Sequence, residues 1–279
     1  MTVSEQPMPA RTMVAVRQAD LGRDGRISTL GVARWLEDAR LRVPMPRFER
    51  LVSSGEMEPF RILLVGQRVE RSDPRGRPGD EVEVTTGIRR VGRSSFTYRH
   101  TVFKDDAVVG TGEATVVLGG ATGPLQLPDE LISDLRGLRV AGAEDGTDRA
   151  SAEQRTRDHY RHWTPLRTRV TDLDSNHHVN FQVLLTWYEE AIAEVVLSAS
   201  AAGRATPSPK LASSDLRIEY TGEVTYPGDY EIGVTVTAVN DDTVHYDLAV
   251  FQAQQCLGTA QARGSRGELT TEALLNLTA

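Results

Sequence analysis

Three polar residues in the second half of the chain have the types and the spacing of a hydrolytic site. Asp174, Asn176 and His178 stand at alternate positions, so in an extended segment their side chains share one face. An imidazole can take a proton near neutral pH, and a nearby carboxylate can orient the ring and stabilise its cation. A carboxamide can orient a water molecule or a carbonyl group. Together these groups suit the attack of an activated water molecule on a carbonyl carbon.

The segment leads into a predicted helix, which offers further polar groups. Apolar residues recur there at helical spacing: Leu184, Trp187, Tyr188, Ala191 and Val195. The first backbone N–H groups of a helix have no intrahelical partner and lie at the positive end of its dipole. We therefore expect the backbone N–H groups of Val179 and Asn180 to bind an oxyanion. Asn180 can alternatively serve as the N-cap of the helix.

The chain contains the same scaffold twice, but the polar residues only once. Residues 19–39 align without a gap with residues 171–191, an offset of 171 − 19 = 152. Identical pairs include Asp20/Asp172, Leu21/Leu173, Trp35/Trp187, Glu37/Glu189 and Ala39/Ala191. At the three site positions the first copy carries Gly22, Asp24 and Arg26 instead. This internal comparison predicts a site in the second copy alone.

Further blocks repeat in the same order and indicate the fold. Arg68–Glu70 precedes Pro78–Asp80, as Arg217–Glu219 precedes Pro227–Asp229. In each half the helix is followed by segments with the alternation of strands. We predict an α+β fold of two units, each an antiparallel sheet wrapped around a central helix. The predicted units are residues 1–120 and 161–279, and a linker rich in Gly, Pro and Asp spans residues 121–160.

Composition excludes several classes of protein. The 279 residues carry 25% charged and 39% hydrophobic residues, which is ordinary for a globular chain. The net charge of −7 disfavours general nucleic-acid binding. The single cysteine, Cys256, allows no disulfide framework and no cysteine-based zinc site. Without a signal peptide or an apolar run of membrane-spanning length, we expect a cytoplasmic protein that does not enter membranes. We expect neither a metal nor a cofactor.

Arginines cluster in the first half of the chain. They are Arg68, Arg71, Arg75, Arg77, Arg89, Arg90 and Arg93. One interpretation is a docking surface for an acidic carrier protein or for the phosphates of coenzyme A. The other is a set of solvated residues around a loop between strands.

Residues 171–190 resemble the motif of the acyl-acyl-carrier-protein (acyl-ACP) thioesterases, which are tandem double-hotdog proteins. The family motif reads approximately D-x-N-x-H-V-N-N, followed by a Trp and a Glu. Ile218-Glu219-Tyr220 and the following Glu223 resemble the strand that carries the catalytic Glu of the family. The resemblance implies four catalytic residues: Asp174, Asn176, His178 and Glu223. In the first copy, Pro74 stands at the position of Glu223.

The resemblance implies hydrolysis of a fatty acyl thioester, on acyl carrier protein or on coenzyme A, in fatty acid biosynthesis. His178 or Glu223 would act as general base, and the residues leave this choice open. Two alternatives remain: a hotdog dehydratase or hydratase acting on acyl thioesters, and a module that binds acyl thioesters without turnover. The two units would act as a pseudo-dimer, either as a monomer or within a homodimer.

Overall fold

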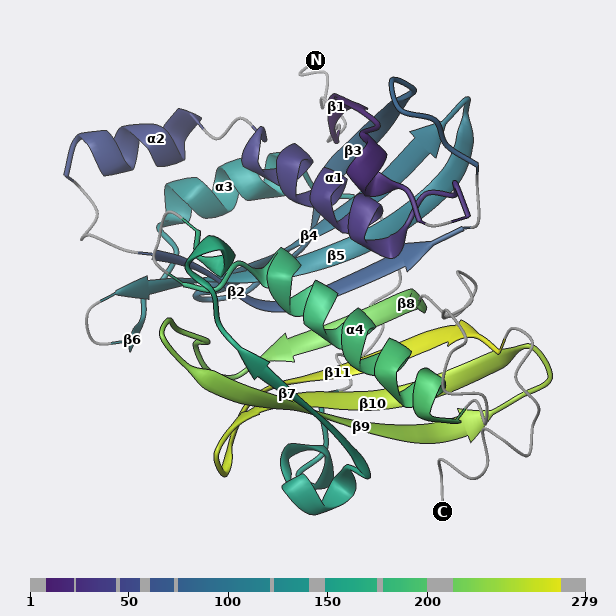
Figure 1. Cartoon of the computed structure of the whole chain (residues 1–279). Helices are drawn as coiled ribbons and strands as arrows, with labels where there is room; N and C mark the ends of the chain where they lie inside the picture. Colours follow the sequence, from purple (N-terminus) through teal and green to yellow (C-terminus); the bar gives the residue numbers. More distant parts are fainter. Residues whose placement is uncertain are drawn as a thin grey trace.

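One antiparallel sheet runs through both halves of the chain, with the two long helices on one of its faces (Figure 1). This computed structural model describes residues 9–22, 24–43, 46–55, 61–72, 75–120, 123–140, 149–174, 178–199 and 213–266. The helices are α1 (Thr29–Leu41), α2 (Pro46–Ser53), α3 (Asp129–Gly137) and α4 (Phe181–Ala199). The strands are β1 (Ala10–Ala15), β2 (Arg61–Arg71), β3 (Glu81–Val91), β4 (Ser95–Lys104), β5 (Ala107–Gly120), β6 (Gly123–Pro124), β7 (His162–Arg167), β8 (Ser213–Tyr220), β9 (Asp229–Val239), β10 (Thr243–Gln252) and β11 (Gln255–Ser265).

The strand order reflects the sequence repeat. The order is β1-β3-β4-β5-β2-β8-β11-β10-β9-β7, and β6 extends β5. The first half of this order comes from the first copy and the second half from the second copy, so β2 and β8 join them. Their pairing runs from Gly66–Glu219 to Glu70–Asp215. An ion pair crosses the junction, with Nη2 of Arg68 3.0 Å from Oδ2 of Asp215.

The apolar stripes of α1 and α4 face the sheet and share one core. Trp35 of α1 is 2% exposed and Trp187 of α4 is 8% exposed, as expected for core residues. One cluster of buried residues includes both side chains together with residues from both halves of the sheet. A second cluster, on the α3 side of the first unit, includes Phe96, Leu131 and Leu135. The first core therefore holds the two units together as well as filling each one.

The repeated aspartates fix the loop that precedes each long helix. Asp20 is buried, and its Oδ2 accepts hydrogen bonds from the backbone N–H of Arg17 at 2.8 Å and from Nε1 of Trp35 at 3.0 Å. Asp172 accepts a bond from the backbone N–H of Arg169 at 2.7 Å. These bonds explain why Asp occurs in both copies although only one copy carries the candidate chemistry.

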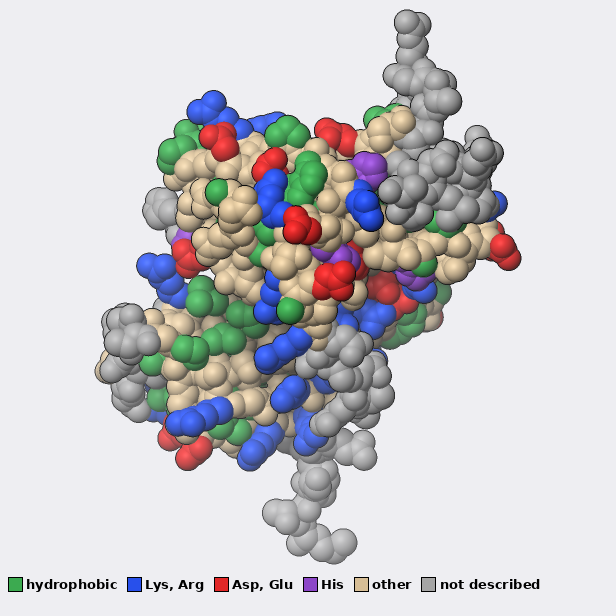
Figure 2. All heavy atoms as spheres, turned by 90° about the horizontal axis from the view of Figure 1, so that it is seen from below, with side chains coloured by type: hydrophobic (Ala, Val, Ile, Leu, Met, Phe, Trp, Pro, Cys, Tyr) green, Lys and Arg blue, Asp and Glu red, His purple; other side chains and the backbone are tan. Residues whose placement is uncertain are grey.

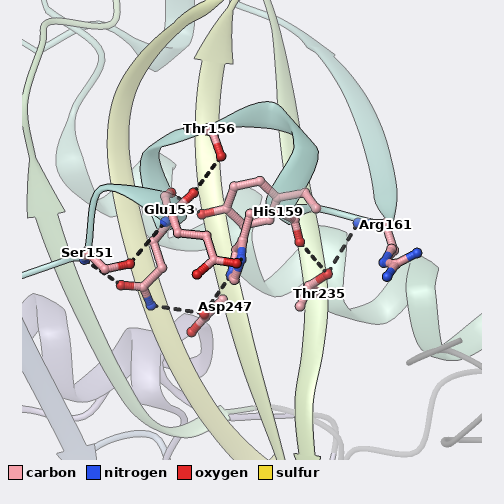
Figure 3. Close-up of polar contacts among 9 residues, drawn as sticks. Ser151, Glu153, Thr156, His159, Arg161, Thr235 and Asp247 are labelled. Atoms are coloured by element: carbon pink, nitrogen blue, oxygen red, sulfur yellow. Dashed lines mark hydrogen bonds and ion pairs between the residues drawn. The ribbon is translucent and has the colours of Figure 1, made fainter.

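The last part of the expected linker is bound to the outer face of the second unit (Figure 3). His159 lies with Nε2 2.8 Å from Oδ2 of Asp247, on β10. Gln154 donates to the same carboxylate at 2.9 Å, and the carbonyl of His159 accepts from Thr235 at 3.0 Å. Residues 149–160 thus follow the sheet closely, and the expected linker also contains α3, which begins at Asp129.

Candidate functional site

The loop that carries Asp174 and His178 is a closed turn held at its base. Leu173 and Val179 form an isolated antiparallel bridge. The backbone N–H of Asp174 donates to the carbonyl of His178 at 2.9 Å. These bonds fix the separation of the two residues before either side chain makes a contact. Asn176, at the middle of the turn, lies outside the described residues.

His178 meets Glu223 across two elements. Nε2 of His178 lies 3.4 Å from Oε2 of Glu223, which follows the end of β8. The imidazole is 24% exposed and the carboxylate 54% exposed, so water reaches both. Backbone bonds fix this approach: Val179 donates to the carbonyl of Val224 at 3.0 Å, and Gly222 donates to that of Leu257 at 2.9 Å. The first bond joins the turn before α4 to the segment that follows β8, and the second holds the end of β8 against β11.

Asp174 lies on the same turn, and its Oδ1 accepts from the backbone N–H of His178 at a long distance of 3.4 Å. The carboxylate thus supports the shape of the turn and places a negative charge near the imidazole. The structure therefore brings His178 and Glu223 together and places Asp174 on the turn that carries His178.

The two backbone donors expected to bind an oxyanion are already occupied. The N–H of Val179 donates to Val224, as described above, and the N–H of Asn180 donates to the carbonyl of Asp172 at 2.9 Å. The expectation is wrong, because these N–H groups already bond to backbone carbonyls that hold the turn closed, and so they cannot also bind substrate. Asn180 instead caps α4, with its Oδ1 accepting from the backbone N–H of Gln182 at 2.7 Å.

The first copy has the same turn with other side chains. Leu21 and Ile27 form the matching bridge, and Gly22 donates to the carbonyl of Arg26 at 2.7 Å. The N–H of Ser28 donates to the carbonyl of Asp20 at 2.9 Å, as Asn180 does to Asp172. Because these backbone bonds recur in both copies, the difference described here lies in the side chains.

One residue of the first unit also reaches the start of α4. Glu37 of α1 accepts a bond from Nε2 of Gln182 at 3.3 Å. Burial raises the pKa of Glu37, and the negative charge of Asp174 adds to this, while Arg40 and Gln182 oppose it. Sequence reasoning read Glu37 as scaffold because Glu189 matches it in the repeat. Only the contact between the helices could place it beside the candidate site.

Two negative findings apply to the described part of the chain. Its His, Cys, Asp and Glu side chains form no group of three or more that could hold a metal ion. Its helices include none that is long and apolar enough to cross a membrane.

Comparisons with known proteins agree with this architecture. Residues 155–264 match the family model of the acyl-ACP thioesterase C-terminal domain, and residues 74–111 match that of the thioesterase superfamily. No curated protein matches the chain by sequence.

Solved structures resemble the whole chain in fold. A 12:0-ACP thioesterase from Umbellularia californica has a TM-score of 0.69 at 18% identity, covering 92% of this chain and 97% of its own. An acyl-ACP thioesterase from Bacteroides thetaiotaomicron has a TM-score of 0.66 at 10% identity, covering 94% and 100%. The α+β tandem double-hotdog fold and the resemblance to acyl-ACP thioesterases are confirmed. The second unit is a thioesterase domain by the family that it matches.

Proposed function

We propose, from the match of residues 155–264 to the acyl-ACP thioesterase C-terminal domain family, that this protein hydrolyses a fatty acyl thioester to a free acid and a thiol. The observation that carries the proposal is the contact of His178 with Glu223, with Nε2 and Oε2 3.4 Å apart. An imidazole can accept a proton from water, a neighbouring carboxylate can hold the ring in place, and both groups here are open to water.

The proposed reaction begins when a water molecule loses a proton to the His178–Glu223 pair. The water oxygen attacks the thioester carbon, and the carbonyl oxygen becomes an oxyanion. Collapse of this intermediate breaks the C–S bond, and the proton passes from the pair to the leaving thiolate. Because the N–H groups of Val179 and Asn180 are occupied, oxyanion stabilisation falls to side-chain donors. In this proposal Asn176 supplies its carboxamide, and Asp174 stabilises the charged form of His178.

Removing either member of the pair tests the proposal. In His178→Ala and Glu223→Gln we expect thiol release from an acyl thioester to fall by roughly 10²- to 10⁴-fold in kcat, as loss of a general base does. The measurement is the initial rate of free-thiol formation. The matched control is Arg26→Ala, which changes the same turn position in the first copy and should retain full activity. Equal rates in wild type and His178→Ala would overturn the proposal.

We further propose that the carrier of the acyl group is acyl carrier protein. On the outer face of the sheet, a groove of about 450 Å³ crosses β2, β4, β5 and β8. Six arginines line it: Arg68, Arg89, Arg90, Arg149, Arg155 and Arg217. Its two carboxylates are already paired, Glu113 with Arg89 and Glu219 with Arg155. Figure 2, which views the molecule from below, shows Lys and Arg side chains gathered over part of the face opposite α4.

This excess of positive charge suits an acidic protein surface, and the phosphates of coenzyme A could also use it. The two carriers are separated by comparing kcat/KM for the same acyl group on each. A preference for coenzyme A would overturn the carrier proposal and leave the hydrolytic one standing. A role in fatty acid biosynthesis, a cytoplasmic location and a pseudo-dimeric monomer or homodimer complete the proposal as predictions from the sequence.

A further inference from the structure

Several polar side chains are buried in the first unit and between the units, and they carry atoms without a partner. We call Arg40, Gln67, His100, Gln182 and Tyr220 the buried polar cluster. Arg40 is 8% exposed, Gln67 4% and His100 1%. Among the described residues, no partner is found for Nη1 of Arg40, Nε2 and Oε1 of Gln67, Nε2 of His100, Oε1 of Gln182 and the hydroxyl of Tyr220. Such atoms are rare in folded proteins, because each costs free energy when water is removed from it.

The members of this cluster surround the end of α1. The guanidinium of Arg40 lies 4.8 Å from the ring centre of Phe181, the neighbour of Gln182. Burial lowers the pKa of His100 to about 3, and the charge of Arg40 lowers it further, so His100 is neutral. Burial also raises the pKa of Tyr220, and here the charge of Arg40 acts in the opposite direction. Arg40 is therefore a buried cation that pairs with Glu37, with Nη2 3.9 Å from Oε1, and that lies beside neutral hydrogen-bonding groups.

The sheet register places the side chains of Gln67 and His100 on the same face of the sheet. Gln67 of β2 pairs with Ala114 of β5, and Ala114 pairs with Tyr98 of β4. His100 pairs in the next inward-facing row with Gly112 of β5. Small residues thus separate the polar side chains of β2 from those of β4, beneath α1.

The cluster borders the candidate catalytic site on one side. Gln182 bonds to Glu37 and belongs to the first turn of α4, next to the cap residue Asn180. Tyr220 precedes Glu223 by three residues. Gln67 and Tyr220 belong to β2 and β8, the two strands that pair at the junction of the units.

On its other side, the cluster borders the second apolar cluster of the first unit. Tyr98, on which Arg40 also acts, packs against Phe96 with ring centres 5.1 Å apart. Phe96 belongs to the buried apolar residues near α3. The polar side chains therefore lie between the catalytic pair and an apolar interior.

The sequence repeat shows that the fold does not require these polar residues. At the helix offset of 152, Ile192 stands in the place of Arg40. The matching blocks Arg68–Glu70 and Arg217–Glu219 place Leu216 opposite Gln67. The dipeptide Gly-Thr also occurs in both copies, at residues 110 and 258, and this offset of 258 − 110 = 148 places Leu248 opposite His100. All three counterparts are buried, at 2%, 1% and 0% exposure. The same framework is thus built with apolar side chains in the second unit.

The residue that matches Tyr220 in the first copy differs from it in having hydrogen-bond partners. Arg71 of β2 stands there in the first copy, and its Nε donates to Oγ1 of Thr29 at 3.2 Å and to the carbonyl of Ser213 at 3.3 Å. That side chain is bonded within the protein, whereas the hydroxyl of Tyr220 has no bond among the described residues. The unbonded atoms therefore concentrate on the side of the junction that holds the catalytic pair.

We propose that the buried polar cluster binds an oxygen function on the acyl chain, a hydroxyl or a keto group, and so selects oxygenated acyl thioesters over plain alkyl ones. This inference rests on the proposed thioesterase function. Arg40, Gln67 and Tyr220 offer donors, and Gln67 and Gln182 offer acceptors. A hydroxyl group can accept from up to two of these donors and donate to one of these acceptors, whereas a keto group can only accept. A plain alkyl chain leaves these groups unbonded, and sites of this kind reject analogues that lack the polar group.

The test uses matched acyl groups on one carrier. Decanoyl, 3-hydroxydecanoyl and 3-oxodecanoyl thioesters of acyl carrier protein, with an isomer oxygenated near the chain end, are compared by thiol release and by analysis of the acid product. We expect kcat/KM for at least one oxygenated ester to exceed that of the decanoyl ester by about tenfold or more. Equal or lower values for all oxygenated esters would overturn the inference alone. No thiol release from any ester, or dehydration without hydrolysis, would overturn the thioesterase function and the inference with it.

Two variants replace a polar residue of the first unit with the leucine that stands at the matching position of the second unit. Gln67→Leu and His100→Leu should reduce the preference for the oxygenated ester by about tenfold while the decanoyl ester is still hydrolysed. Thermal unfolding confirms that each variant is folded. The control is Tyr246→Phe, which removes a partnerless buried hydroxyl from β10, at the position matching Tyr98. It should leave the preference unchanged. An undiminished preference in both leucine variants would overturn the assignment of this role to the cluster.

Discussion

At the scale of single residues, some side chains of the turn before each long helix stabilise the turn, and others differ between the two copies. Asp20 and Asp172 accept backbone bonds in both copies, whereas His178 and Arg26 occupy the same backbone position with different chemistry. The repeat therefore served as a control for the polar residues of the second copy. The same control misread Glu37, because a residue identical in both copies can still lie beside the site in only one of them.

Two arginines of the groove allow a test of carrier binding at this scale. Arg90 and Arg149 line the groove, and neither has an ion pair among the described residues. Arg90→Glu and Arg149→Glu should raise KM for acyl-ACP by about three- to tenfold at low salt, with little change in kcat, because charges at a rim act mainly on encounter.

Steady-state kinetics at two salt concentrations measures this effect, which should shrink at high salt. Arg136→Glu, on the last turn of α3, is the charge-matched control outside the groove. An unchanged KM in both groove variants would show that the carrier binds elsewhere.

At the scale of elements, close packing of α1 on the sheet positions the first unit against the site. Gly112 of β5 lies directly beneath Leu36 of α1. A Cβ at residue 112 would lie 2.2 Å from Cδ1 of Leu36 and 2.7 Å from the carbonyl oxygen of Arg68. Glycine thus permits the helix to approach the strand, and this approach carries Glu37 and Arg40 toward α4.

Gly112→Ala should therefore destabilise the protein by about 1–3 kcal/mol, as overpacking of a filled core does. Urea unfolding measures the change as a lower midpoint with an unchanged slope. The control is Gly137→Ala in α3, where an added Cβ meets nothing within 4 Å and helix propensity favours alanine. Equal midpoints for wild type and Gly112→Ala would contradict the packing argument.

At the scale of the whole molecule, the two units are joined by a network of hydrogen bonds around Ser213 as well as by the sheet. Glu189 of α4 accepts bonds from the backbone N–H of Ser213, at 3.2 Å, and from its hydroxyl. The carbonyl of Ser213 in turn accepts bonds from Thr29 of α1 and from Arg71 of β2. Glu189 is the counterpart of Glu37 in the repeat. Glu189 is bonded to Ser213 in this network, whereas Glu37 is bonded to Gln182. The pair of His178 and Glu223 thus occurs once in a nearly two-fold framework.

The burial of Glu189 in this hydrogen-bond network predicts a pH dependence of stability. Burial raises the pKa of Glu189, and the bonds from Ser213 and the charge of Arg71 only partly oppose this. Because the folded state holds the proton more tightly, the stabilisation is complete below the unfolded pKa and is lost as pH rises through the folded pKa. Glu189→Gln, which stays neutral, should raise the free energy of unfolding relative to wild type at neutral pH.

That difference should shrink as pH falls toward the ordinary value of a glutamic acid. Urea unfolding across about pH 4 to 8 measures it. Glu190→Gln, the exposed neighbour on α4, is the control and should show no such pH-dependent gain. A lower stability of Glu189→Gln at neutral pH would contradict the argument.

The sequence by itself determined the repeat, the two helices with their buried tryptophans and the copy that carries the polar residues. These features follow from periodicity and spacing within one segment, which need no knowledge of distant contacts. Tertiary structure alone decided that the N–H groups of Val179 and Asn180 are already bonded, and that Arg40, Gln67 and His100 carry buried polar atoms without a partner among the described residues. Those outcomes depend on the register between strands and on the approach of α1 to α4, which bring together residues from both ends of the chain.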